Sequence, residues 1–493
     1  MVGLRVSVGM YGMRLYTADA FMVLDGAWRM VNGQRPHVDF NSMIGPAAYL
    51  PTVVGFRLAA NTSRGFADGQ ALVGLGVGIW AYWLAAKLNE FPRIVYALCV
   101  TAVAISPAEL GLGPLATTPA MTYNRFAYGL LGILLLECLS TGVGSELAAG
   151  FSSGVVLGLL MFGKISAFAG AVLLIVTLVT QRTQTGRRWL GLVAGAGSVS
   201  LCFLSYLRFD VIAVVRDLTI TVLSKRVVWQ DYILSAIATD LLIVALVVYR
   251  SYWVLIQSGK PDAAKRLFVA GVSVSLTSLL LIFTNYQQSE LPLLGLFLLI
   301  VGQRLLVDSR IKGVSGSGLR SLITTGCVIL AGLTVFFATA SLCATQWVAL
   351  HSAVGAPRFD APALRQFVPI SYEQAYTEGE NDGFRILKQY RRPGERVMSL
   401  DFSNPFSYGM WIPPAPGGST NLQFNGSFSE HHYVSPERLF GNADLVFVPK
   451  IFTDPSLSGS VPRIYGPYLE SHFELIAENR RWKLYRNRAE KTS

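Results

Sequence analysis

Long apolar runs separated by short polar gaps fill the first 345 residues of the chain. A helix that crosses the hydrocarbon core of a bilayer needs about 20 consecutive apolar residues. Ten runs come close to this length, and they predict membrane spans at 70–88, 94–108, 124–141, 145–162, 165–181, 188–207, 232–249, 266–285, 290–307 and 320–345. The pattern therefore predicts an α-helical polytopic membrane domain over residues 1–345.

The pattern changes after residue 346, where short apolar runs alternate with Pro and Gly turns. Short runs of this kind are typical of strands. In one further stretch the apolar residues are spaced three or four positions apart, which indicates a helix. The predicted elements are strands at 396–400, 444–448, 473–476 and 482–485, the last two paired around Glu478–Asn479, and a helix at 380–391. We expect residues 346–493 to form a separate α/β domain.

The composition agrees with a membrane protein. Of the 493 residues, 52% are hydrophobic and 14% are charged, whereas soluble domains carry about 25% charged residues. This excludes a water-soluble enzyme. The net charge of +11 does not indicate a nucleic-acid partner, because the basic residues are spread over short gaps between apolar runs.

Alternate gaps between the predicted spans are rich in Lys and Arg. These gaps lie near 87–93, 182–188, 250–266 and 304–320, and such basic gaps face the cytoplasm in membrane proteins. The intervening segments should then share the opposite, outer face. They are residues 15–68, 109–123, 208–231 and everything after 346.

The first outer loop, over about 17–68, contains the most informative polar residues. We expect a helix with Thr17 or Asp19 as its N-cap, ending at Asn32–Gly33 and followed by an extended segment at 36–40. Asp19 and Asp39 bracket this helix. From spacing alone, Asp19 can cap the helix and Asp39 can fix a turn, since Asp is common at both places.

The same loop resembles the first outer loop of the GT-C superfamily of integral-membrane glycosyltransferases. The similarity lies in Asp19, a helix, the pattern G-x-x-P-x-x-D-F at Gly33–Phe40 and the Gly-Pro pair at 45–46. Tyr123–Arg125 and the C-terminal α/β domain are also similar to bacterial members, such as the protein O-mannosyltransferases and the lipid A aminoarabinose transferase. Many members have Asp-Glu where this chain has Asp19-Ala20, so the second acid is missing.

Members of the superfamily also have a membrane helix before this loop. Residues 1–16 contain Arg5, Arg14 and three glycines, which makes a poor spanning helix. We therefore expect a first helix upstream of the present start.

The resemblance implies transfer of a sugar from a polyprenyl-phosphate carrier to a hydroxyl acceptor. The phosphate is a good leaving group, so the reaction needs a carboxylate base and cations more than a strong acid. By resemblance, Asp19 is the candidate base and Asp39 the second candidate. His37 and Asn124 are candidates for positioning the acceptor or the loop. Direct attack would invert the anomeric centre.

Basic residues at the outer boundary are candidates for binding the donor phosphate. Lys164 lies at the tip of a tight hairpin between the spans 145–162 and 165–181, and Arg125 opens a helix after an outer loop. The full set is Arg125, Lys164, Arg216, Lys225 and Arg226. The alternative for each is a long side chain that reaches the membrane interface without a specific ligand.

Other features leave alternatives open. Asp240 lies inside a predicted span, where an acid is costly and often functional, and it would favour a transporter or flippase for a lipid-linked glycan. A polysaccharide polymerase or ligase would instead use outer Arg and His residues. Aromatic residues of the C-terminal domain can stack on sugars or form its core. His37 and Asp39 are too few for a metal site, so no cofactor is expected, although a divalent metal stays open.

The sequence thus predicts a membrane glycosyltransferase with a polyprenyl-phosphate sugar as donor. The acceptor hydroxyl would belong to a glycolipid, a polysaccharide or a protein. We expect it in a bacterial inner membrane, among membrane lipids, with the C-terminal domain in the periplasm. A transferase predicts Asp19 in a cavity with a basic residue nearby, whereas a transporter predicts a central cavity around Asp240.

Overall fold

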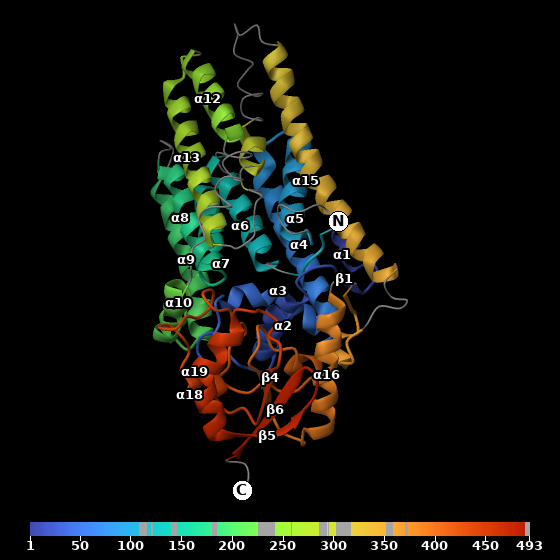
Figure 1. Cartoon of the computed structure of the whole chain (residues 1–493). Coiled ribbons are helices and arrows are strands. Elements are labelled where there is room, and N and C mark those ends of the chain that lie inside the picture. The colour runs from blue at the N-terminus through green and yellow to red at the C-terminus, as the bar shows by residue number, and fades with distance from the viewer. Residues whose placement is uncertain are drawn as a thin grey trace.

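The computed structural model of the chain describes residues 1–107, 116–119, 122–139, 145–179, 185–224, 242–257, 259–284, 293, 295–301, 317–351, 358–369 and 373–488. An elongated helical bundle occupies one end of the molecule and an α/β domain the other (Figure 1). The long helices are α4 (Arg64–Leu84), α5 (Glu90–Ile105), α6 (Thr122–Leu139), α7 (Glu146–Met161), α8 (Ile165–Val179), α9 (Gly186–Tyr206), α12 (Leu242–Gln257), α13 (Pro261–Thr284) and α15 (Ser317–His351).

Each predicted membrane span overlaps a helix, although part of 232–249 and of 290–307 lies outside the described residues. Within those residues, α9, α13 and the Gly332–His351 part of α15 are long and apolar enough to cross a bilayer, and the apolar helices α7 and α8 are shorter. Leu190, Val193 and Leu201 on α9 point outward and are 63%, 65% and 61% exposed. An outward apolar surface of this kind suits contact with lipid.

Helices α7 and α9 approach closely because glycines line their contact. Gly150 and Gly154 of α7 face Gly191 and Gly195 of α9; a Cβ at Gly154 would lie 2.1 Å from the Leu192 carbonyl oxygen. Small residues four apart let helix backbones pack closely in membranes, where burial in lipid supplies no hydrophobic drive. The predicted hairpin of α7 and α8, with Lys164 in the connection, is also present.

The C-terminal domain contains a four-stranded sheet with the order β3-β4-β6-β5. Its strands are β3 (Val397–Ser399), β4 (Leu445–Pro449), β5 (Phe473–Glu478) and β6 (Trp482–Asn487), and its helices are α16 (Gln374–Tyr390), α17 (Phe406–Gly409), α18 (Pro436–Phe440) and α19 (Leu457–His472). β3 and β4 are parallel, and the other neighbours are antiparallel. The predicted strands and the β5–β6 pair are confirmed, and the predicted helix begins earlier, at Gln374.

Two tyrosines of this domain, Tyr408 and Tyr465, are 0% exposed and belong to its core. Phe406 stacks on Phe447 of β4 with ring centroids 4.1 Å apart, and Trp482 packs edge-on against both rings. Of the two alternatives for the aromatic residues, forming the core of the domain therefore applies to these side chains.

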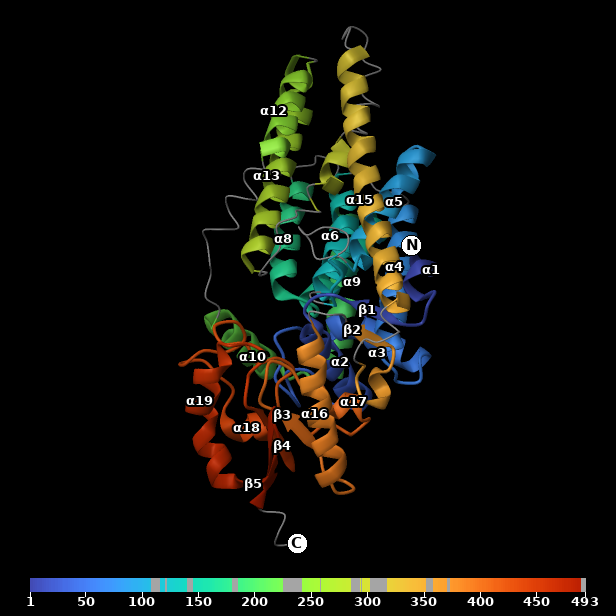
Figure 2. The same cartoon turned by 45° about the vertical axis from the view of Figure 1, so that its right-hand side comes forward.

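The N-terminal segment packs against the C-terminal domain rather than against the helical bundle alone. It contains α1 (Val2–Val6), β1 (Tyr11–Met13), α2 (Thr17–Val31) and α3 (Pro46–Leu58). Figures 1 and 2 show α2 and α3 between the bundle and the sheet. One hydrophobic cluster joins residues 11–67 to residues 359–484. β1 also pairs in parallel with β2 (Phe367–Pro369).

A buried ion pair reinforces this packing. Arg29 and Asp25 of α2 are 1% and 0% exposed, and their nitrogen and oxygen atoms lie 2.7 Å apart. Arg29 also donates to the carbonyl oxygens of Ala415 and Gly417, at 2.9 and 2.7 Å. Burial raises the pKa of Asp25, and the charge and hydrogen bond of Arg29 lower it in part. Arg29 thus joins α2 to a C-terminal loop.

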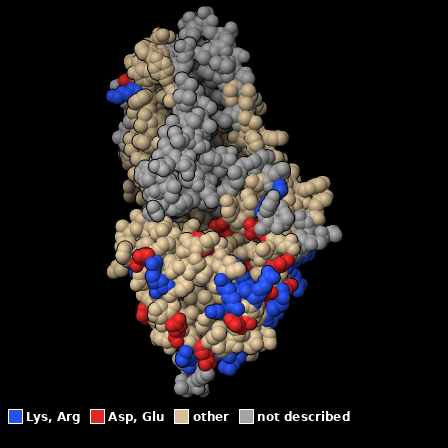
Figure 3. Space-filling model, viewed as in Figure 1, with Lys and Arg blue, Asp and Glu red and all other residues tan. Residues whose placement is uncertain are grey.

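The predicted outer segments do share one end of the molecule. Helix α10 (Val211–Ser224) contacts the C-terminal domain, where Ser224 donates to the His432 carbonyl at 3.0 Å. The backbone of Arg14 donates to Thr117, which connects the first and second outer loops at 2.9 Å. In Figure 3 charged side chains gather over the lower, C-terminal part, whereas the described bundle surface is mostly uncharged.

Two local predictions for the first loop are wrong. The N-cap of α2 is Tyr16, so Thr17 and Asp19 already belong to the helix. Residues 36–40 form a tight turn closed by a Pro36–Phe40 bridge, with His37 at a φ of 68°, and are not extended. An extended chain would hold residues 35 and 39 about 13 Å apart, whereas the turn brings Arg35 and Asp39 into contact.

The first loop also contains a helix that the apolar pattern did not indicate. Helix α3 follows Gly45, with Pro46 in its first turn, a position that suits proline. The predicted end of α2 at Asn32–Gly33 is confirmed, since Asn32 is the C-cap and Gly33 has a φ of +83°.

Candidate active site

A cavity of about 790 Å³ lies where the helical bundle, the first loop and the C-terminal domain meet. Tyr123 of α6 and Lys164, Ile165 and Ser166 at the start of α8 form its bundle side, together with Thr284 at the end of α13. The first loop contributes Tyr16, Ala18, Asp19, Met22, Met43 and Ile44, and α10 contributes Thr221 and Val222. The C-terminal domain closes the remaining side.

Asp19 enters this cavity from the first turn of α2. A carboxylate in this turn interacts favourably with the helix dipole. The N-terminus of α2 is held from the far end of the chain, because the Tyr16 backbone N–H donates to Glu373 Oε1 at 2.9 Å. Tyr16 has a φ of 55°, which is uncommon for a residue with a side chain. Glu373 therefore fixes the turn that carries Asp19.

Glu373 lines the cavity as well. Burial raises its pKa, while hydrogen bonds from Tyr16 and Thr17 lower it in part. The cavity thus has two acids at one helix end, one from each end of the chain. No sequence pattern around Glu373 indicated this, since the two residues are brought together by tertiary packing.

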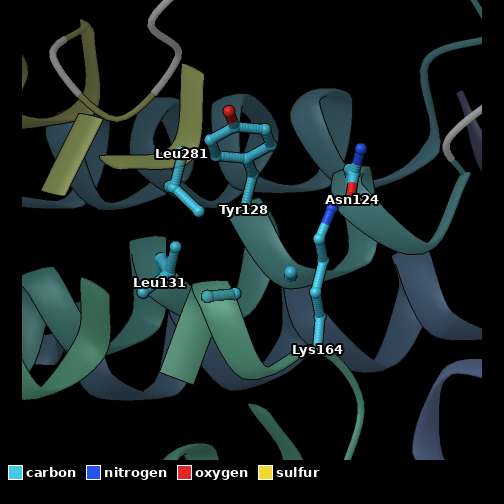
Figure 4. A pocket seen from close by; sticks show the side chains of 7 residues that line it. Asn124, Tyr128, Leu131, Lys164 and Leu281 are labelled. Atoms are coloured by element: carbon cyan, nitrogen blue, oxygen red, sulfur yellow. Dashed lines mark hydrogen bonds between the residues drawn. The ribbon is translucent and has the colours of Figure 1, made fainter. Parts of the chain in front are cut away.

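Lys164 is the cation on the bundle side of the cavity. Its ammonium group donates to Asn124 Oδ1, and Nζ lies 5.0 Å from the centroid of the Tyr123 ring. Figure 4 shows Lys164 extended toward Asn124 along a small recess that also includes Tyr128 and Leu281. Tyr123 is also close enough to Asp19 for the two groups to interact electrostatically. The predicted residues Asp19, Asn124 and Lys164 are therefore gathered in one place.

Arg481 is the cation on the C-terminal side. It interacts with two buried acids behind the cavity wall, Glu380 and Asp401. Burial raises the pKa of Glu380 well above its ordinary value, the charge of Asp401 raises it further, and Arg481 lowers it. Burial also raises the pKa of Asp401, against hydrogen bonds from Thr453 and Phe402. The charge of Arg481 thus acts on both buried acids.

The structure places Asp39 elsewhere. Arg35 donates to its two carboxylate oxygens from Nε, Nη2 and the backbone N–H, at 2.7 to 2.9 Å. Although burial acts in the opposite direction, these hydrogen bonds lower the pKa of Asp39. The described lining of the cavity does not include Asp39. Its geometry is that of a residue that closes a turn.

His37 and Arg216 belong to a second cluster outside the cavity. His37 is 2% exposed, and its Nδ1 lies 3.4 Å from Asp217 Oδ2. Arg438 of α18 binds Asp217 at 2.8 Å, and Arg438 and Arg216 both donate to the His37 carbonyl. Burial acts to raise the pKa of Asp217, but its contact with His37 and the charge of Arg438 outweigh this and lower it. This cluster joins the first loop, α10 and α18.

The remaining phosphate candidates divide into two groups. Arg125 is 2% exposed within α6, and the described lining of the cavity does not contain it. Lys225, Arg226 and Asp240, the acid predicted inside a span, lie outside the described residues.

Within the described part of the chain, no three His, Cys, Asp or Glu side chains are grouped to hold a metal ion.

Comparisons with known proteins were made by sequence and by structure. No family model and no curated protein matches the sequence. The crystal structure of ArnT from Cupriavidus metallidurans bound to undecaprenyl phosphate aligns with 98% of this chain and 96% of its own, with 13% identity and a TM-score of 0.51. The apo state of the same protein aligns over 100% and 97%, with 13% identity and a TM-score of 0.49.

The first alignment shows that this chain has the fold of ArnT, a GT-C lipid A aminoarabinose transferase. The likeness extends over the whole chain, including the α/β region at its C-terminus. The predicted fold class, a polytopic helical membrane protein with a C-terminal α/β domain, is thereby confirmed. At 13% identity the likeness is one of fold.

Proposed function

We propose that this protein is a membrane glycosyltransferase that takes a sugar from a polyprenyl-phosphate donor and transfers it to a hydroxyl acceptor. The observation that carries the proposal is the cavity that both Asp19 and Lys164 line. The fold supports it, since ArnT has the same architecture and was crystallised with undecaprenyl phosphate. The two side chains are a base and a phosphate-binding cation, the two groups that such a transfer requires.

The donor would lie with its phosphate at Lys164 and its lipid chain toward the bundle. Lys164 supplies a point charge for the phosphate oxygens. Asn124 holds the ammonium group through its amide oxygen, so the cation is oriented before the donor arrives. Ile165 and Val222 are apolar and exposed at this side of the cavity, which suits the first isoprene units of the carrier.

Asp19 would act as the base. It takes the proton of the acceptor hydroxyl while the hydroxyl oxygen attacks the anomeric carbon. The bond between that carbon and the phosphate oxygen breaks, and the electron pair leaves with the phosphate, next to Lys164. A single displacement of this kind inverts the anomeric centre. The proton then passes from Asp19 to water.

The location of the reaction forms part of the proposal. The first loop, α10 and the C-terminal domain share one end of the molecule. Two gaps rich in Lys and Arg lie largely within the described residues, between α4 and α5 and between α12 and α13, and both are located away from this end (Figure 2). Such gaps face the cytoplasm. We therefore assign the cavity and the C-terminal domain to the outer face, which is the periplasm in a bacterial inner membrane.

A transfer assay with a matched pair of aspartate variants tests this function. The full-length protein, in membranes or nanodiscs, is given radiolabelled polyprenyl-phosphate sugars and a crude envelope acceptor fraction. Asp19→Asn should lower the transfer rate by about 10²- to 10⁴-fold, the usual contribution of a general base. Asp39→Asn should leave the rate within about threefold, because a surface pair of this kind contributes at most about 1 kcal/mol. Equal rates for wild type and Asp19→Asn would remove Asp19 as the base.

A further inference from the structure

Four polar side chains of the C-terminal domain line the cavity. They are Asn421, Gln423, Asp454 and Arg481. They come from three separate loops of the domain. We call these four residues the domain wall. The bundle side contributes Lys164 with Tyr123, Ile165, Ser166 and Thr284, and it has no carboxylate or amide group in the described lining.

Two groups of the domain wall lack a hydrogen-bond partner among the described residues. Asn421 is 3% exposed, and its Oδ1 has none. Arg481 Nε is buried and has none. Both side chains also line the cavity, so a ligand there would contact them through their other, accessible polar atoms.

Two buried acids, Asp401 and Glu380, are near enough to Arg481 to interact with its charge. The side chain packs against Gly379 of α16, where an added Cβ would lie 3.2 Å from its Nε. The guanidinium group of Arg481 offers several N–H donors on this side of the cavity.

The other charges around the cavity disfavour a second anion. Asp454, Asp19 and Glu373 all line the same space, and like charges within a few Å repel each other. An apolar alcohol would leave the amides of Asn421 and Gln423 without partners. A hydroxyl group both donates and accepts, so several hydroxyls match a wall that offers carboxylate, amide and guanidinium groups together.

Two aromatic rings complete this side of the cavity. Phe402 and Phe452 line it next to the polar residues, and both are half-buried. An aromatic face packs well against the apolar face of a sugar ring while the hydroxyls of that ring reach polar neighbours. The combination of rings and mixed hydrogen-bonding groups is suited to a carbohydrate.

We propose that the domain wall is the acceptor subsite and that it binds a neutral, polyhydroxylated glycan headgroup. The inference rests on the proposed function, because it places the acceptor opposite the donor phosphate in the same cavity. The glycan would sit between Arg481, Asp454 and the amides of Asn421 and Gln423, with one hydroxyl directed toward Asp19. The protein would then act on a glycan or glycolipid rather than on a protein hydroxyl.

Direct glycan binding, measured without donor, tests the subsite. The full-length protein in nanodiscs carries a fluorophore and is applied to an array of neutral glycans, sulfated and uronic-acid glycans, and Ser/Thr peptides. We expect binding to neutral glycans. Gln423→Ala and Asp454→Asn should each weaken it by about fivefold, equivalent to one hydrogen bond of about 1 kcal/mol. Gln374→Ala and Asp382→Asn, matched changes on α16 outside the described lining, should not.

Each other outcome has a defined meaning. Binding confined to anionic glycans or to peptides overturns the inference, as does neutral-glycan binding that both wall variants leave unchanged, or no glycan binding at all. A melting curve checks that Asp454→Asn is folded, since this carboxylate also accepts from the Ser456 N–H at 2.9 Å. Wall-dependent glycan binding by a wild-type protein that shows no sugar transfer would reject the proposed function and keep the subsite.

Discussion

Asp19 and Asp39 lie in one loop, on either side of one helix, yet the fold gives them different surroundings. Asp19 lines a cavity together with a lysine from the bundle. Asp39 is held by three hydrogen bonds from Arg35, and the described lining of the cavity does not include it. A carboxylate that closes a turn contributes geometry, whereas one that lines a cavity is within reach of a substrate. Residue type and spacing do not distinguish the two acids. The difference arises because the first turn of α2 places Asp19 at the cavity, whereas the turn at 36–40 places Asp39 against Arg35.

The largest expected effect concerns the packing that holds α2 in place. Arg29→Met leaves the carboxylate of Asp25 buried without its counter-ion, and removal of one partner from a buried ion pair costs about 3–5 kcal/mol. We expect a clear drop in the melting temperature of the purified protein and loss of transfer with it. The double variant Asp25→Leu/Arg29→Met should recover much of the stability. A single variant as stable as wild type would show that this pair does not anchor the loop.

The next effect separates the cation in the cavity from one outside it. Lys164→Met removes the charge proposed to bind the donor phosphate, and kcat/KM for the lipid donor should fall by about 10²-fold. Arg216→Met removes a cation of the His37–Asp217 cluster, and kcat/KM should stay within about threefold. Initial rates over a range of donor concentrations measure both. Equal decreases in kcat/KM for the two variants would mean that both cations act through the overall positive charge of the surface rather than through a specific contact with the donor.

Most helices and strands could be predicted from the sequence, because each depends on the residues within its own segment. A bilayer requires an apolar run from every spanning helix, and strand pairs such as β5–β6 are marked by the turn between them. The Lys164 hairpin could be found in the same way, since it joins two apolar runs. Asp19 was found by the resemblance of its loop to the GT-C superfamily, because spacing alone also fits a helix cap. These local signals also placed the outer loops on one side.

The rest of the site depends on contacts between residues far apart in the chain. Glu373 reaches Tyr16 across more than 350 positions, and Arg481 approaches the same cavity from a hairpin near the C-terminus. Nothing in either neighbourhood marks a functional residue. The pairing of Arg35 with Asp39 was missed for another reason, because an extended segment was expected where the chain makes a turn around His37.

Glu373 provides a test of that long-range contact. Glu373→Ala removes the acceptor for the Tyr16 N–H, and the loss of a helix cap costs about 1 kcal/mol. If the contact between Glu373 and the Tyr16 N–H positions Asp19, kcat should fall by about tenfold with little change in KM for the donor. Glu373→Gln keeps an amide oxygen at the same place and should restore most of the rate. A change in KM alone, or a Gln variant as slow as the Ala variant, would indicate that the charge itself binds substrate.

The smallest expected effect tests the structural role of Asp39 by its pH dependence. Hydrogen bonds from Arg35 lower the pKa of this carboxyl in the folded protein below its ordinary value of about 3.9. A lowered pKa stabilises the fold above the ordinary value, and the contribution is lost as the pH falls through the folded-state pKa. Both side chains are partly exposed, at 15% and 26%, so we expect at most about 1 kcal/mol. The melting temperature of Asp39→Asn should therefore lie slightly below wild type at pH 7 and approach it near pH 3. A difference that does not change with pH would assign the effect to packing rather than to the ion pair.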